Sequence, residues 1–165
     1  MHRKILFQDH SCKQSHLTEL AGFPSNTSLI IAGDTPSSYK QTGVQLKERI
    51  ATHEEGIVRY ANKVSEYIPL LADAFNHDNK ANISRIIALL FDSVCTDMNI
   101  NNPSYSTMVA SVLSAGAYAA KNIGLRFCGG SIFALCDPRY VPQVVQAITK
   151  PSTFVHVIEK EQIIF

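Results

Sequence analysis

The stretch NPSYSTMVASVLSAGAYAAKNIGLRFCGGSIFALCD, from Asn102 to Asp137, decides the fold of this chain. Pro103 is typical of a first helical position, because the N–H that proline lacks would have no helical partner there. Gly124 is typical of the residue after a helix ends. Between them, apolar residues recur at three- and four-residue spacing on one face, namely Met108, Val112, Ala115, Ala119 and Ile123. The stretch therefore predicts a helix from Pro103 to Ile123.

The second half of the same stretch predicts two extended segments joined by a glycine turn. Apolar residues stand on either side of Gly129 and Gly130. Two glycines leave backbone N–H groups uncovered, and such groups bind anions. The loop is thus a candidate anion site, and an ordinary hairpin turn is the alternative. Lys121 falls in the last turn of the predicted helix, where a basic side chain suits the helix dipole.

Outward from this centre, the chain alternates between short apolar runs and helical patterns. The run SLIIAG at 28–33 predicts a buried strand. Helices are expected at 39–50, from Thr52 as the cap to Phe75, at 83–98 and at 141–148. Pro69 lies inside the second of these and is expected to kink or divide it. Strands are expected at 153–158 and 163–165, and one short strand at 4–8.

This order of elements predicts an α+β fold with one small antiparallel sheet of about four strands, covered by helices on one face. With 165 residues the chain is long enough for a single domain with a hydrophobic core. Residues 1–27 are polar and are expected to form a loosely structured lead-in. The domain itself is expected to span 28–165.

Composition excludes several classes of function. The net charge is +1 and there is no long basic run, so we expect no nucleic-acid partner. No apolar run approaches the ~20 residues that span a bilayer, so we expect no membrane segment. The four cysteines lack metal-ligand spacing, and the histidines and cysteine near the start fit no compact metal site. Reduced thiols are typical of a cytoplasmic protein, which is the location we expect.

Several ordered pieces of the chain resemble the carboxyl-terminal half of the GHMP kinase superfamily, and most of all the mevalonate kinases. The segment 29–35 resembles an apolar strand that ends in Gly-Asp-Thr, and 37–40 stands where those kinases carry Ser-Thr-Lys. Residues 98–103 stand where they carry Leu-Gly-Val-Ser before a helix. The segment 115–121 resembles Ala-Gly-Ala-Leu-Gly-Ala-Lys, and 124–135 stands where they carry a glycine-rich loop and an apolar strand.

The resemblance implies a ferredoxin-like domain of an enzyme that transfers the γ-phosphoryl group of ATP, with Mg²⁺, to a hydroxyl of mevalonate or a similar small molecule. The matching positions imply a substrate- and phosphate-binding set and no catalytic residue of its own: Asp34, Thr35, Lys40, Gly124, Arg126, Cys128, Gly129, Gly130 and Ser131. For Asp34 and Thr35 the alternative is turn and capping chemistry. For Lys40 and Arg126 it is an exposed or ion-paired side chain.

The chain departs from the family pattern in two ways. The glycine-rich loop is reduced to 128–131, and Leu125-Arg126-Phe127 is similar to the Arg-Phe of sugar kinases in the same superfamily. Nothing between Met1 and Ser28 resembles the family's triphosphate-binding loop. We therefore expect the chain alone to be inactive, with a kinase half or another copy as its partner. The alternatives are a sugar kinase and a non-catalytic binding or protein-interaction module.

Overall fold

A computed structural model describes residues 5–8, 17–20, 23–34, 48–52, 54–99, 103–123, 131–150 and 153–158. Its centre is a four-stranded sheet with the order β4-β5-β3-β6. These strands are β3 (Ser28–Asp34), β4 (Ala117–Asn122), β5 (Ser131–Cys136) and β6 (Thr153–Ile158), and every neighbouring pair is antiparallel. The predicted α+β class with about four antiparallel strands is confirmed.

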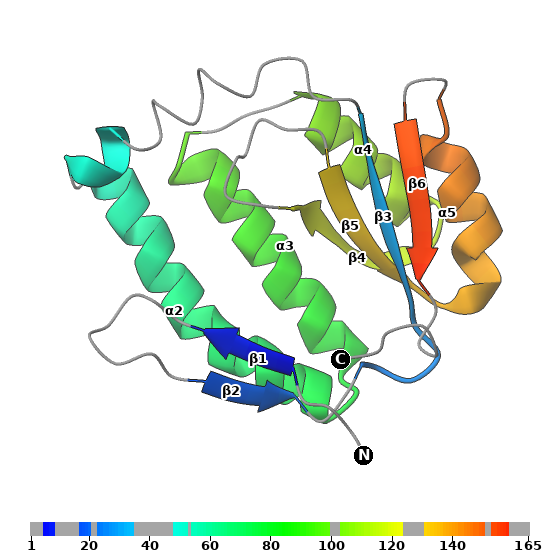
Figure 1. Ribbon diagram of the computed structural model, residues 1–165, viewed down its shortest axis with the longest axis horizontal. Coiled ribbons are helices and arrows are strands. Elements are labelled where there is room, and N and C mark those ends of the chain that lie inside the picture. Colours follow the sequence, from blue (N-terminus) through cyan, green and yellow to red (C-terminus); the bar gives the residue numbers. More distant parts are fainter. Residues whose placement is uncertain are drawn as a thin grey trace.

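Helices cover both faces of the sheet, so the prediction of one covered face is wrong. Figure 1 shows α4 (Pro103–Ser114) and α5 (Val141–Ile148) behind the strands, and α2 (Glu55–Asn76) and α3 (Lys80–Thr96) on the other side of β4. Ile30 and Ala120 belong to the core with α4 and α5, whereas Ala119 and Leu135 belong to a second core with α2 and α3. Neighbouring strand residues face opposite sides, and both sides are apolar here.

The central stretch contains a helix, a turn and a strand, and not the single long helix that its periodicity predicts. The helix α4 ends at Ser114, and β4 begins three residues later. Gly116 has a φ of 112°, which favours glycine, and an added Cβ would lie 2.8 Å from the ring of Tyr140. The alanine-rich run after it fits either period, and its pairing with β5, interrupted by a register shift between Ala117 and Ala119, makes it a strand.

The helix α2 starts two residues later than its sequence signals indicate and ends one residue later, at Asn76. It runs continuously through Pro69, which is exposed, so this proline does not divide the helix, and the alternative of a kink stays a prediction. Thr52 does not cap it, since its hydroxyl donates to the carbonyls of Glu48 and Arg49. The break before α3 is confirmed: Asn79 accepts a hydrogen bond from the N–H of Asn82, which caps the helix.

The first part of the chain carries one strand more than predicted. β1 (Ile5–Gln8) confirms the expected short strand, and it pairs with β2 (Leu17–Leu20), which sequence patterning did not indicate. The predicted helix at 39–50 is described only at its end, where residues 48–51 are helical. A 3-10 turn, η1 (Pro138–Tyr140), precedes α5. The expected strand at 163–165 and the extended segment at 125–127 lie outside the described residues.

Candidate functional site

The end of β3 and the start of β5 lie side by side, at the end of the sheet that the sequence singled out. Gly33 pairs with Ser131, and Asp34 is the last residue of its strand. The N–H of Ile123 donates to the carbonyl of Ser131 at 2.9 Å. The last residue of β3 and the first residue of β5 therefore stand at the same end of the sheet, which lies toward the top of Figure 1.

Most of the predicted site residues lie outside the part of the chain that the structure describes. These are Thr35, Lys40, Gly124, Arg126, Cys128, Gly129 and Gly130. The backbone of Asp34 pairs with Thr153, and Ser131 is half-buried at the start of β5. The structure thus brings the strand positions of Asp34 and Ser131 to neighbouring strands, and the roles of all nine residues stay predictions.

Lys121 lies in a strand, so its assignment to a last helical turn is wrong. Its side chain is half-buried in β4, and its Nζ donates to the carbonyl of Asn122 at 3.4 Å. Burial lowers the pKa of Lys121 to about 8. Lys121, the penultimate residue of β4, is therefore a half-buried cation at neutral pH close to the end of that strand.

Asn122 is a polar residue that sequence patterning missed. Its side chain is 3% exposed, and its Oδ1 accepts no hydrogen bond. A buried acceptor without a donor is rare in native proteins and often marks a place where a ligand or water binds. Asn122 pairs with Ile132, an apolar core residue, and this position in the core follows only from the pairing of β4 with β5.

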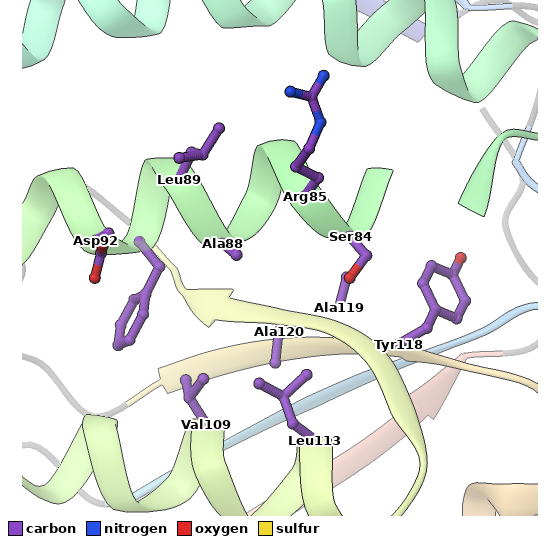
Figure 2. A pocket seen from close by; sticks show the side chains of 11 residues that line it. Ser84, Arg85, Ala88, Leu89, Asp92, Val109, Leu113, Tyr118, Ala119 and Ala120 are labelled. Atoms are coloured by element: carbon purple, nitrogen blue, oxygen red, sulfur yellow. The ribbon is translucent and has the colours of Figure 1, made fainter. Parts of the chain in front are cut away.

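A groove of about 400 Å³ lies along the edge of β4 that faces away from β5, between α3 and α4 (Figure 2). Ser84, Arg85, Ala88, Leu89 and Asp92 line it from α3. Val109 and Leu113 line it from α4, and Tyr118, Ala119 and Ala120 form its floor. Sequence patterning predicts that all of these residues lie in helices, and a groove between two helices depends on how the helices pack.

Tyr118 closes one end of this groove and is fixed there by polar contacts. Its hydroxyl forms a 3.1 Å hydrogen bond with the Thr27 hydroxyl, and the Lys80 ammonium lies 5.7 Å from the ring centroid. Burial raises the pKa of Tyr118 to about 12. The phenol is therefore neutral at physiological pH and acts as a hydrogen-bonding anchor.

Within the described residues, no three His, Cys, Asp or Glu side chains are placed to hold a metal ion. In the same part of the chain, no helix is long and apolar enough to cross a bilayer.

No protein-family model matches this chain, and no curated protein matches it in sequence. Solved structures do match it. L. major mevalonate kinase in complex with R-mevalonate is 11% identical with a TM-score of 0.67, over 95% of this chain and 49% of that one. Lactococcus lactis galactokinase complexed with galactose is 14% identical with a TM-score of 0.66, over 93% and 50%.

Homoserine kinase from Cytophaga hutchinsonii also matches, with 18% identity and a TM-score of 0.60, over 88% of this chain and 45% of the kinase. The chain therefore spans about half the length of the kinases it matches. At these identities the likeness is one of fold. This chain has the fold of the carboxyl-terminal half of GHMP kinases.

Proposed function

We propose that this chain is the substrate-binding and lid domain of a GHMP-type small-molecule kinase. The observation that carries the proposal is the match of nearly the whole chain to about half of several such kinases. In the complete enzyme the γ-phosphoryl group of ATP passes to a hydroxyl of a small molecule. Such catalysis consists mainly of positioning and charge stabilisation.

The described residues fit a phosphorylated or hydroxyl-bearing ligand at the end of the sheet. Lys121 supplies a cation there, and the buried Oδ1 of Asn122 lacks a donor, which a substrate hydroxyl or an ordered water provides. Arg126, Gly129, Gly130 and Ser131 are proposed to hold phosphate, and Asp34 with Thr35 to hold the substrate. ATP and Mg²⁺ supply the transferred group and neutralise its charge.

A kinase half with the triphosphate-binding loop is the proposed partner, because the match covers only half of each kinase. Mevalonate is the first substrate to test, on the strength of segments 29–35 and 115–121. A sugar is the second, since Arg126-Phe127 is similar to the sugar kinases and the galactokinase match is of equal quality.

The test is a titration of the isotope-labelled chain with ATP and Mg²⁺, mevalonate, galactose and homoserine, each added separately and followed by backbone amide NMR. We expect saturable shifts at Asn122, Ser131 and segment 124–130 with nucleotide and with one substrate only. We expect no phosphoryl transfer by the chain alone. Shifts that are absent with all four ligands, or confined to other segments, would refute the proposal.

An activity assay of the isolated chain gives a second, independent criterion. Robust turnover with ATP and any of the three substrates contradicts the proposed division of labour between two halves. Lys121→Met tests the role of the cation, and we expect weaker nucleotide shifts in this variant. Lys150→Met, which removes an exposed lysine after α5, is the matched control and should leave them unchanged.

A further inference from the structure

The edge strand β4 leaves backbone hydrogen-bonding groups without a strand partner. Among the described strands, β4 pairs only with β5. The bond from the Ile123 N–H to Ser131 shows that residue 123 points its backbone groups toward β5. Antiparallel ladders alternate, so Lys121 points the same way, whereas Ala120 and Asn122 point their N–H and C=O groups toward the free edge.

The groove described above runs along this free edge, and its walls are apolar. Figure 2 shows α3 on one side of β4 and α4 on the other, with Ala119 and Ala120 between them. Ala88 is small and leaves room above the strand. Leu89 and Leu113, one on each wall, are 37% and 42% exposed. Side chains of an added strand, which alternate between the two sides, would each meet one of these leucines.

Two opposite charges stand at the rim of the groove without an ion-pair partner among the described residues. Arg85 and Asp92 are both exposed and lie seven residues apart on α3, which places them about 10 Å from each other on nearly the same face. An extended segment spans that distance in about three residues. The carbonyl of Asn122 already accepts from Lys121, so the open acceptor is that of Ala120.

The packing of α3 and α4 on β4 favours a partner segment without flanking helices over a second copy of this domain. Antiparallel pairing brings strands to about 4.8 Å, whereas two helices need about 10 Å between axes. Because α3 and α4 both pack on β4, a second β4 would bring its own two helices into the space that they occupy. A segment that carries no flanking helices meets no such obstacle.

We propose that the free edge of β4 binds an extended segment of a partner polypeptide, added as a strand between α3 and α4. The segment has small or medium apolar side chains on both faces, with one acidic residue at the Arg85 end and one basic residue at the Asp92 end. Backbone hydrogen bonds to Ala120 provide the register, and the two leucines provide the apolar contact. The edge thus serves as a docking site, distinct from the sheet end proposed for substrate.

The test is selection of a phage-displayed library of random decapeptides on the full chain. Selected peptides are then measured against three variants. Leu89→Glu and Leu113→Glu place a charge on either wall, and Leu70→Glu is the matched control, because Leu70 is an exposed leucine of α2 outside the groove. We expect the two wall variants to weaken binding roughly tenfold or more and the control to leave it unchanged.

Backbone amide exchange supplies the readout that separates strand addition from other binding. We expect a bound peptide to slow exchange of the Ala120 amide, and N-methylation of alternate peptide bonds to abolish the effect. Failure to select peptides sensitive to both wall leucines would overturn the proposal, as would unchanged exchange at Ala120. Concentration-dependent dimerisation of the chain that Leu89→Glu and Leu113→Glu both abolish would also overturn it, and would assign the groove to a second copy.

Discussion

Gly56, in the first turn of α2, lies directly against the backbone of Asp97 at the end of α3. An atom in the Cβ position of residue 56 would lie 2.0 Å from the carbonyl oxygen of Asp97. The close approach sets the start of α2 beside the end of α3. It also brings Lys63 within reach of the Asp97 carboxylate, to which Lys63 Nζ donates at 2.6 Å.

Gly56→Ala is therefore expected to destabilise the protein, although the same change stabilises most helices by about 1 kcal/mol. The added methyl group meets backbone, which cannot move away as a flexible side chain does, and overpacking of this kind costs about 1–3 kcal/mol. Urea unfolding followed by circular dichroism measures the change. Asn62→Ala, at an exposed position of α2, is the control and should be neutral or slightly stabilising. If Gly56→Ala is as stable as wild type or more stable, residue 56 does not lie as close to the Asp97 backbone as described.

The Asp97 carboxylate is expected to make folding sensitive to acid. The hydrogen bond from Lys63, with a smaller contribution from Arg59, holds the pKa of Asp97 below its ordinary value of 3.8. A lowered folded pKa stabilises the protein above the ordinary value, and this stabilisation is lost as the pH falls from 3.8 toward the lowered value. NMR titration of the carboxyl carbon in wild type and Lys63→Met measures it. We expect the pKa of Asp97 to rise in Lys63→Met, and to rise less in Arg59→Met, whose Nε lies 3.5 Å from the carboxylate. The reverse order would refute this assignment.

Asp78 is expected to stabilise the turn that precedes β3 by binding Ser25, which is 53 residues away in the sequence. It accepts hydrogen bonds from the N–H (3.1 Å) and the hydroxyl of Ser25, and its own φ is 52°. Asp78→Ala should lower the free energy of unfolding by about 1–3 kcal/mol, because it removes both bonds and strains a left-handed residue. Asp78→Gly, which tolerates that φ, separates the two effects and should lose less. If thermal unfolding of Asp78→Gly matches wild type, the two hydrogen bonds contribute nothing measurable.

The half-buried ammonium of Lys121 is expected to lower the free energy of unfolding at neutral pH. This loss of stability is expected to disappear at high pH, where the side chain is neutral. Its folded pKa, lowered by burial to about 8, lies below its ordinary value of 10.5. Between these values the unfolded chain binds more protons, so stability rises with pH over this window. Lys121→Met should be more stable than wild type at pH 7, and the difference should shrink as the pH approaches 10.5. Urea unfolding of both proteins across pH 7–10.5 tests this, and a difference that is independent of pH would contradict it.

The class of fold could be read from the sequence because it depends on local patterns. The apolar run at 28–33, the helical period at 83–94 and the alternation at 153–158 each survive in the structure as β3, α3 and β6. The ordered set of motifs led to the fold of the GHMP kinases before any coordinates, although identity to the matching kinases is only 11–18%. Segment 124–130, on which the site prediction centres, lies outside the described residues.

Tertiary structure decided what local patterns left open. The run AYAAKN at 117–122 fits a helix as well as a strand, and only pairing with β5 settles it, because ladder hydrogen bonds join residues that are distant in sequence. Because of that pairing, Lys121 is a half-buried cation in a strand and not a helix-end cation, and Asn122 lies in the core. The groove between α3 and α4 likewise exists only through packing. The sequence by itself determined which segments are apolar. Long-range burial determined which period each ambiguous segment adopts and, as at Gly116, where the chain turns.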